Sequence, residues 1–504
     1  MKNKKMLCVK ILNDIKCICL WMLLSAMCCG CWGCSDSGGE SGEKPDNGDE
    51  GPASSRNLLF NSSDKKLEST FYWGKRTALS YAHDGNDPVG YWYEAALPGR
   101  NAFCMRDASH QSIAAEILGL SKHNFNIMEK FAENISEAKD WCTHWEIDKD
   151  NRPCKADYVS DDNFWYNLNA NFDIIFACWR LYEWTGDERY LKNRKLAEFF
   201  DLSINTYVEH WQLRPDNIMS RKGVMHSNLS KRGIPSYVET FGGMASSSDL
   251  IATIYGGFDA YAKMRTVLGK GDGGEYQAQA EAYRRLLEEE WWNSDINAYH
   301  TFRRDNGTFA DGEGLTYMLW FNAAQQTERI RGTITKMMER TSWNIENISH
   351  FPLLWYRYNY IEDAYEILKN ISTMNRSSYP EVSYGMIEGI ISGTMGIVPS
   401  ASQKKVITLP KMLNPDANAY LQAENIPMLQ GYITVRHDGN KATKFVNNTP
   451  GELIWQAAYM GEIAKITIDG EQRNTQVRTD LMGNKISYVE VKVPVGAEIQ
   501  AKIE

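Results

Sequence analysis

Apolar residues recur at steps of three and four along positions 163–184. They are Phe164, Leu168, Phe172, Ile175, Phe176, Trp179 and Tyr182. These steps bring side chains to one face of a helix, so the segment is predicted to be an amphipathic helix. The same reasoning predicts about twelve helices. They lie near residues 64–82, 108–119, 122–139, 163–184, 188–209, 244–266, 272–290, 314–324, 327–340, 350–358, 361–370 and 383–395.

The turn Thr185-Gly186-Asp187 separates two of these helices. Gly186 can adopt the left-handed conformation that ends a helix, and Asp187 can cap the helix that follows. This turn predicts a tight αα-hairpin. Helices joined alternately by tight and long connections indicate six hairpins, so we expect an (α/α)6 toroid over residues 57–396. In a toroid of this kind the even-numbered helices line the inside, and the loops that enter them gather on one face.

Short runs of alternating apolar and polar residues replace the helical pattern after about residue 397. They lie at 405–409, 432–436, 444–446, 464–468 and 488–493, with turn residues such as Asp438-Gly439-Asn440 between them. This alternation is typical of strands. Residues 397–504 are therefore predicted to form a small antiparallel β-sandwich that packs against the helical domain.

The first 34 residues combine a basic start with an apolar run at 18–33 that carries no charge. Such a run is typical of a secretory signal and is too short to span a bilayer well. Cys34 follows the small residue Gly33, as the lipidated cysteine does in a bacterial lipoprotein. Cys31 after Gly30 is the competing site, and a cleaved signal without lipid is the alternative.

Residues 35–56 hold Gly, Ser, Asp, Glu and Pro and almost nothing apolar. A segment of this composition is predicted to be a disordered, acidic linker. An acidic stretch directly after the lipidated cysteine resembles the surface-export signal of Bacteroidetes lipoproteins, while an ordinary solvated spacer is the alternative. We expect an outer-membrane lipoprotein, exposed at the surface or facing the periplasm, attached to the membrane through its N-terminal lipid only.

The composition narrows the partners and cofactors. The formal net charge is −9 and basic clusters are missing, which argues against nucleic acid. Outside the signal region the cysteines are Cys104, Cys142, Cys154 and Cys178, whose irregular spacing indicates neither a zinc ribbon nor a disulfide scaffold. Cys142 with Cys154 is the preferred pair if a bridge forms. We expect no cofactor and no metal, although residues 84–87 have a calcium-like composition without the Glu of an EF-hand.

A carboxylate lies at every predicted entry to an even-numbered helix. The acidic residues at these entries are Asp107, Asp161 and Asp162, Glu239, Asp311 and Glu313, Glu346, and Glu381. In a toroid all of them face one cavity. Sugars stack on aromatic rings and bind carboxylates and arginines through their hydroxyl groups. We expect the substrate-binding residues to be Arg106, Asp107, His110, Asp162, Trp165, Asp311, Glu313 and Trp343.

Each of these residues also has an ordinary structural explanation. Asp161, Asp162 and Asp311 are typical helix N-caps, and Glu381 is favourable beside a helix dipole. Arg106 and Asp107 form a plausible ion pair at a helix start, and His110 is as consistent with interior packing as with sugar binding. The joint pattern, rather than any single residue, indicates a sugar site.

Three segments carry a resemblance to a known family. One is the hairpin sequence Tyr182-Glu183-Trp184-Thr185-Gly186-Asp187. Met105-Arg106-Asp107 resembles the Arg-Asp pair that holds the terminal sugar in glucoamylase-like enzymes. The sequence Ser-Tyr-Pro-Glu at 378–381, followed by a glycine-rich helix, resembles a segment of uncharacterised bacterial relatives. Over about residues 58–400 the chain resembles the six-hairpin glycosidase superfamily, which includes glucoamylases, trehalases and α-L-rhamnosidases.

This resemblance implies a general acid in the loop between helices 5 and 6 and a base in the loop between helices 11 and 12. By loop order these residues are Glu239 and Glu381, with Asp311, Glu313 and Asp107 as rivals. The pKa of Glu239 is then expected to be raised while Glu381 stays ionised. In an inverting enzyme their carboxyl groups lie about 6.5–9.5 Å apart, and in a retaining enzyme about 5 Å apart.

The favoured function is an exo-acting, inverting glycoside hydrolase that acts on an oligosaccharide or polysaccharide of plant or host origin. One alternative is a polysaccharide lyase on the same fold, with Tyr237, His226 and Arg232 as its residues. A uronic acid substrate would need a basic pocket, for which Arg106, Arg221 and Arg232 are available. The other alternative is a glycan-binding lipoprotein without catalytic activity.

Overall fold

The structure is a computed structural model that describes residues 57–95, 97–222, 232–238 and 243–504. The predicted signal, linker and lipid site at Cys34 lie outside the described residues. So do Glu239, predicted to be the general acid, and His226.

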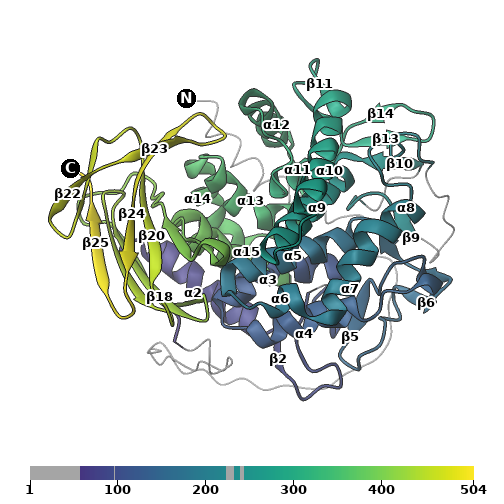
Figure 1. Ribbon diagram of the computed structural model, residues 1–504, viewed down its shortest axis with the longest axis horizontal. Coiled ribbons are helices and arrows are strands. Elements are labelled where there is room, and N and C mark those ends of the chain that lie inside the picture. The colour runs from purple at the N-terminus through teal and green to yellow at the C-terminus, as the bar shows by residue number, and fades with distance from the viewer. Residues whose placement is uncertain (1–56, 96, 223–231, 239–242) are drawn as a thin grey trace, which may run out of the picture.

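Six helices contact one another around a closed ring (Figure 1). In order they are α3 (Met105–Ile117), α5 (Ala170–Thr185), α9 (Ser248–Val267), α11 (Leu315–Trp320), α13 (Ile345–Arg357) and α15 (Pro380–Glu388). Each contacts the next, and α15 contacts α3. In α3, 12 of 13 residues are buried, and in α9, 15 of 20, as expected of helices that are covered on most sides.

The other helices alternate with this inner ring along the chain and lie outside it. They are α2 (Lys65–Leu79), α4 (Ser121–Ala132), α6 (Arg189–Lys192), α7 (Arg194–Leu202), α8 (Val208–His210), α10 (Gly273–Leu286), α12 (Thr327–Glu339) and α14 (Ile361–Asn370). The mainly helical architecture predicted from the sequence is confirmed.

Three predicted helices differ clearly from the structure. The predicted helix at 122–139 ends at Ala132, and Glu137–Lys139 is a separate 3-10 turn. The predicted helix at 163–184 begins only at Ala170, because Asn163–Phe164 and Tyr166–Asn167 are short strands. The predicted helix at 188–209 is divided into α6, α7, a π-helical turn at Ser203–Tyr207, and α8. Asn193 causes the first break, since its side chain accepts hydrogen bonds from the first turn of α7. The hairpin turn is as predicted: Gly186 ends α5 with a φ of 69°.

Short strands pair in the loops of the helical part. They are β2 (Ala82–Asp84), β3 (Tyr91–Tyr93), β4 (Ala102–Cys104), β5 (Glu146–Asp148), β6 (Tyr158–Ser160), β7 (Asn163–Phe164), β8 (Tyr166–Asn167), β9 (Arg232–Ile234), β10 (Met244–Ser247), β11 (Trp292–Asn293), β12 (Ala298–Tyr299), β13 (Phe302–Arg304) and β14 (Phe309–Ala310). Several of them lead directly into inner helices, as β4 does into α3 and β10 into α9. They therefore fix where these helices begin.

The helices α13 and α15 approach each other closely because α15 and the π-helical turn that follows it (Gly389–Thr394) carry glycines on the shared face. A Cβ at Gly385 would lie 2.4 Å from the carbonyl oxygen of Ser349. At Gly389 and Gly393 it would lie 2.8 Å from Pro352 and Tyr356, respectively. This close packing fixes the position of the first turn of α15, which carries Glu381.

The C-terminal part consists of two packed sheets, seen as the yellow and light green strands at the left of Figure 1. Their strands are β15 (Val398–Ser400), β16 (Lys405–Thr408), β17 (Tyr420–Met428), β18 (Gly431–Asp438), β19 (Ala442–Asn448), β20 (Leu453–Met460), β21 (Lys465–Ile468), β22 (Glu471–Asn474), β23 (Gln476–Thr479), β24 (Lys485–Val493) and β25 (Glu498–Lys502). Phe445 of one sheet stacks on Trp455 of the other, with ring centroids 5.2 Å apart, so the core lies between the sheets.

Two features of this β-sandwich were not expected. The strand β16 pairs with β20 in parallel, which corrects the prediction of a purely antiparallel sandwich. The strand β1 (Leu59–Ser62), from the start of the described chain, pairs with β17 at the edge of the seven-stranded sheet. The described part of the chain therefore passes through the sandwich at β1 before it enters the helical ring.

The described cysteines Cys104, Cys142, Cys154 and Cys178 are all buried and free, so the preferred pair of Cys142 with Cys154 does not form a bridge. Among the described residues, no helix has the length and apolar character that crossing a membrane requires.

Candidate active site

Acidic residues occupy the first turn of five inner helices. They are Asp107 of α3, Asp173 of α5, Asp249 of α9, Glu346 of α13 and Glu381 of α15. The contacts described below link these first turns, so they lie at the same end of the ring. Asp173 and Asp249 were not predicted, because the acids expected for these two helices were residues that precede them in the sequence. The sequence Ser247-Ser248-Asp249 is a typical helix start and could have indicated Asp249.

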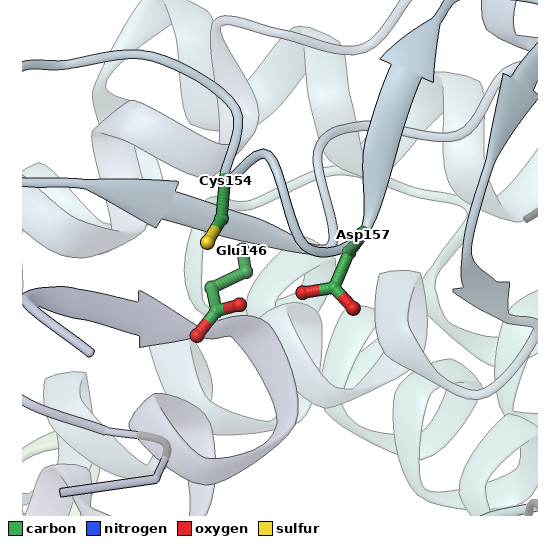
Figure 2. Close-up of side chains that lie close together, drawn as sticks. All are labelled: Glu146, Cys154 and Asp157. Carbon is green, nitrogen blue, oxygen red and sulfur yellow. The ribbon is translucent and has the colours of Figure 1, made fainter. Parts of the chain in front are cut away.

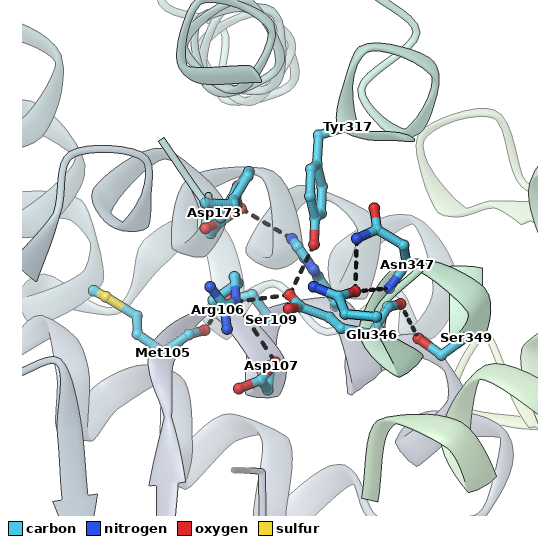
Figure 3. Close-up of polar contacts among 12 residues, drawn as sticks. Met105, Arg106, Asp107, Ser109, Asp173, Tyr317, Glu346, Asn347 and Ser349 are labelled. Carbon is cyan, nitrogen blue, oxygen red and sulfur yellow. Dashed lines mark hydrogen bonds and ion pairs between the residues drawn. The ribbon is translucent and has the colours of Figure 1, made fainter. Parts of the chain in front are cut away.

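Arg106 is the cation at the centre of this end of the ring (Figure 3). Its Nε lies 2.8 Å from Oε1 of Glu346 and 3.7 Å from Oδ1 of Asp107. The hydroxyl of Tyr317 donates a 2.8 Å hydrogen bond to the same Oε1 of Glu346. The Arg106 guanidinium also lies 5.6 Å from the ring centroid of Trp145. These contacts fix the orientation of the Glu346 carboxylate, and they place Arg106 and Asp107 together as predicted.

Glu381 faces the same group of charges. It lines a small cavity of about 20 Å³ together with Asp107, His110 and Glu346. Desolvation raises the pKa of Glu381 well above its usual range, and the negative charges of Asp107 and Glu346 raise it further, whereas Arg106 opposes this shift. The structure thus contradicts the expectation that Glu381 stays ionised. The main reason is that burial disfavours the charged form of Glu381, and the neighbouring carboxylates of Asp107 and Glu346 add to this effect.

Asp173 links two further residues of the site. Its Oδ1 lies 3.1 Å from Nε2 of His110 and accepts a 2.6 Å hydrogen bond from the hydroxyl of Tyr237. Burial raises the pKa of Asp173 and of Tyr237, and it lowers the pKa of His110 to about 3. His110 is therefore neutral at physiological pH. Its ring packs among those of Tyr317, Trp320 and His350, while one edge faces the small cavity.

Asp249 holds the loop that carries Tyr237. Its Oδ2 accepts hydrogen bonds from the Ser236 hydroxyl at 2.8 Å and from the backbone N–H of Tyr237 at 2.9 Å. Burial raises the pKa of Asp249 to about 6, although these hydrogen bonds oppose the shift. Asp249 is therefore a positioning residue that fixes the end of the loop before residue 239.

A larger cavity of about 510 Å³ opens beside this cluster, and Arg106, Tyr237, Tyr317 and Glu346 line it. Its far side carries Asp311 and Glu313, two of the predicted substrate-binding residues. Nη2 of Arg340 lies 2.8 Å from Oε1 of Glu313, and Nδ1 of His300 lies 2.8 Å from Oδ1 of Asp311. Desolvation raises the pKa of Glu313, and Arg340 opposes the shift. The volume suits a small ligand, and the lining combines aromatic faces with carboxylates.

Three predicted substrate-binding residues lie elsewhere. Asp162 is exposed in the turn between β6 and β7, and Trp165 is half-buried against the hydrophobic core. Trp343 is 8% exposed and packs edge-on against Phe351. None of these three described residues lines either cavity. The short strands at 163–167 explain the positions of Asp162 and Trp165. Because of these strands, α5 begins seven residues after the predicted start of this helix.

One group of side chains has the composition of a metal site (Figure 2). Ligand atoms of Glu146, Cys154 and Asp157 lie within 4.8 Å of one another. Nη1 of Arg100 lies 3.3 Å from Oε2 of Glu146, and its Nη2 lies 3.7 Å from Oδ2 of Asp157. Desolvation raises the pKa of Glu146 to about 9, and Asp157 contributes to the shift. With Glu146 protonated, the single Arg100 guanidinium offsets the charge of Asp157, so the arrangement of these acids is explained without an ion.

Comparisons with known proteins were made for sequence and for structure. The sequence matches no protein-family model, and a search of curated proteins finds no match. Among solved structures, the chain is similar to the α-L-rhamnosidase from Dictyoglumus thermophilum, with a TM-score of 0.56 and 14% identity over 89% of this chain and 50% of that one. It shares its fold with α-L-rhamnosidases.

Two further structures support this result. The GH78 family rhamnosidase of Bacillus sp. GL1 has a TM-score of 0.52 and 12% identity over 77% of this chain and 40% of that one. A putative kojibiose phosphorylase from the human microbiome has a TM-score of 0.51 and 9% identity over 88% of this chain and 68% of that one. The chain thus spans half or less of the two rhamnosidases, and identities this low establish the fold alone.

Proposed function

We propose that this chain is an exo-acting glycoside hydrolase, and that its ring of helices is an (α/α)6 toroid of the six-hairpin type. The fold shared with α-L-rhamnosidases supports both parts of the proposal. The sugar binds in the cavity of about 510 Å³, where Arg106, Glu313 and Glu346 offer charged groups to its hydroxyls and Tyr237 and Tyr317 offer aromatic surface.

The observation that carries the proposal is the environment of Glu381. Glycoside cleavage requires a carboxyl group that is protonated at the working pH, so that it can donate to the leaving oxygen. Desolvation, Asp107 and Glu346 together keep Glu381 in this form. We therefore assign Glu381 as the proton donor, the reverse of the role that loop order gives it. Glu239, two residues after Tyr237 in the sequence, is the proposed partner that activates water, which leads to inversion.

The first test is hydrolysis of a panel of aryl glycosides, beginning with an α-L-rhamnoside, by protein that lacks residues 1–34. We expect release of one monosaccharide. Glu381→Gln and Glu239→Gln should each lower kcat by about 10²–10⁴-fold, the range of general acid–base catalysis. Glu275→Gln is the matched control, because Glu275 lies in the first turn of the outer helix α10. No turnover on any substrate, with oligosaccharide binding intact, would instead support the glycan-binding alternative.

The acidity of the leaving group distinguishes the proton donor from the residue that activates water. A good leaving group needs no proton, so Glu381→Gln should retain most activity on a dinitrophenyl glycoside and lose it on an alkyl glycoside. An equal loss on both substrates would assign Glu381 to water activation instead. Proton NMR of the first sugar released reports inversion or retention. An added arm with inorganic phosphate tests for a sugar phosphate product, as a phosphorylase would form.

The lyase alternative is weaker in this structure. The raised pKa of Tyr237 makes its phenol a poor base. Arg221 donates to three backbone carbonyls, and Arg232 donates to the carbonyl of Asp161 and pairs with Asp140. Neither arginine lines the two cavities of the site. Formation of an unsaturated uronate by the protein would overturn this preference.

The same proposal includes attachment to the membrane through a lipid on Cys34. The basic start, the apolar run and the small residue before Cys34 support it. We propose an outer-membrane location on the same grounds.

A further inference from the structure

A second large cavity lies at the opposite ends of the same inner helices, between them and the β-sandwich. It has a volume of about 720 Å³. Its walls come from the C-terminal halves of α5 and α13, from the π-helical turn after α15, and from the strands β15, β16 and β23. It does not contain the residues of the proposed catalytic reaction, which lie in the first turns of the inner helices.

Three cations line this cavity without an acidic partner at ion-pair distance among the described residues. Nζ of Lys411, whose side chain is buried, donates a 2.5 Å hydrogen bond to the carbonyl of Tyr356. Nη1 of Arg357 donates to the carbonyls of Leu319 and Trp320, both at 3.0 Å. Arg478 lies on the exposed strand β23 and reaches the same cavity. Carbonyls satisfy hydrogen bonds but leave the positive charges unbalanced.

The acids that line the cavity have their own partners. Glu388 forms an ion pair with Arg180, and Glu183 accepts hydrogen bonds from the hydroxyl of Ser400 and the backbone of Ser402. Asp480 accepts hydrogen bonds from Asn359 and Asn484. Burial and the nearby charges of Arg478 and Arg357 lower the pKa of Lys411 to about 8, even though Asp480 opposes this shift. The lining of the cavity holds four cations and three acids, so its net charge is positive and favours an anion: the cations are Arg180, Arg357, Lys411 and Arg478, and the acids are Glu183, Glu388 and Asp480.

The remaining walls are suited to a sugar ring. Trp179 and Trp184 both line the cavity, and Trp179 is only half-buried. An inorganic anion occupies a small fraction of the volume, whereas cavities of about 300–1,000 Å³ hold ligands of sugar size. We propose that this cavity binds an acidic sugar, with its carboxylate at Lys411 and Arg478 and its ring against Trp179. The proposed hydrolase activity is not required for this binding.

The test is calorimetric titration of the protein lacking residues 1–34 with tri-galacturonate, neutral galactotriose and sodium sulfate. We expect tri-galacturonate to bind and galactotriose to bind at least ten-fold more weakly. Lys411→Met and Arg478→Gln should each weaken tri-galacturonate binding at least ten-fold. Arg473→Gln is the matched control, because Arg473 lies on the neighbouring exposed strand β22 and does not line the cavity.

Several results would overturn the proposal. One is the absence of tri-galacturonate binding, and another is binding that both Lys411→Met and Arg478→Gln leave unchanged. Sulfate binding as tight as that of tri-galacturonate would reduce the cavity to an anion site. The Glu381→Gln variant distinguishes this cavity from the proposed active site. It should bind tri-galacturonate as the parent does. Loss of tri-galacturonate binding in this variant would place the ligand in the active site instead. Because Arg478 is exposed, its substitution tests the idea even if Lys411→Met does not fold.

Discussion

Arg106 contacts the carboxylates of Asp107 and Glu346 and faces Glu381, so its positive charge opposes the rise in the pKa of Glu381 that desolvation causes. As the proposed proton donor, Glu381 is active while protonated, and activity falls as the pH rises through its pKa. Arg106 favours the ionised form and Asp107 disfavours it. We therefore expect Arg106→Gln to move the alkaline limb of the kcat profile to higher pH and Asp107→Asn to move it to lower pH.

Both of these variants should also lose activity, because both residues face the proposed sugar site. The informative quantity is thus the pH at which the residual kcat of each variant falls on the alkaline side. It is measured with an activated aryl glycoside. Shifts in the same direction in both variants would contradict the assignment of the limb to Glu381.

Glu146 makes a separate prediction about stability. Its pKa is raised from 4.5 to about 9 in the folded protein. Its contribution to stability is fully present below the unfolded pKa and is lost as the pH rises through the folded one. Glu146→Gln keeps a neutral side chain at all pH values, so its Tm should fall less than that of the parent between about pH 5 and 9.

Thermal melts at several pH values provide the measurement. The exposed Glu339 supplies a control, since Glu339→Gln should reproduce the pH dependence of the parent. If Tm depends on pH in the same way in Glu146→Gln and in the parent, the raised pKa of Glu146 does not contribute to folding stability.

At the residue scale, the sequence predicted the Arg106-Asp107 pair and the carboxyl group of Glu381, because each lies at the entry to a predicted inner helix. It did not predict Asp173, since the strands at 163–167 could not be distinguished from the first turns of an amphipathic helix. Trp343 was predicted to bind substrate, but in the structure its ring packs against Phe351 and lines neither cavity. Composition cannot tell an aromatic ring that lines a cavity from one that packs in the core.

The contact between α13 and α15 gives the prediction at the scale of the element. An alanine at 385 places its Cβ against the backbone of Ser349, which cannot move away as a flexible side chain would. We expect Gly385→Ala to destabilise the protein by about 1–3 kcal/mol, the usual cost of overpacking, and to lower activity by displacing Glu381.

Gly274→Ala is the matched control. Gly274 lies in α10, and a Cβ added there would have no neighbouring atom within 4 Å. Because alanine favours a helix over glycine by about 1 kcal/mol, this variant should be as stable as the parent or more stable. Equal denaturant midpoints for the two variants would show that the close approach is not important.

The elements whose hydrophobic residues recur at a regular spacing were predicted well from the sequence. The hairpin at Gly186 and the helix α12 match the prediction because local residues determine both. The interrupted outer helix at 189–210 does not match, because its breaks depend on Asn193 and on the packing of the π-helical turn. The parallel pairing of β16 with β20 depends on contacts between strands far apart in the chain, which no local pattern contains.

At the scale of the whole molecule, the strand β1 joins the start of the described chain to the β-sandwich. Phe60 is fully buried and stacks on Phe71 of α2 at 4.7 Å, whereas its neighbour Leu59 is 41% exposed. Phe60→Ala should cost about 3–5 kcal/mol of folding free energy. Leu59→Ala, on the opposite face of the same strand, should cost far less, and chemical denaturation compares the two. Equal costs would contradict the role given to β1.

Membrane attachment is also a property of the whole molecule. We expect Cys34→Ser to move the protein from the membrane fraction to the soluble fraction in a Gram-negative host, while Cys31→Ser should leave it attached. The mass of the mature N-terminal peptide identifies the modified residue. Loss of attachment in Cys31→Ser alone would assign the lipid to Cys31.

The position of β1 also determines how the molecule responds to mechanical force. A pull on the chain before Leu59 reaches β1 first, where four residues pair with β17. A pull along an antiparallel pair loads its hydrogen bonds together in shear, so they resist as a group. The helical ring, with the proposed catalytic groups, follows β1 in the chain and is shielded from the load while this pairing holds. If the proposed lipid anchor holds the chain, the proposed active site would thus stay intact under tension.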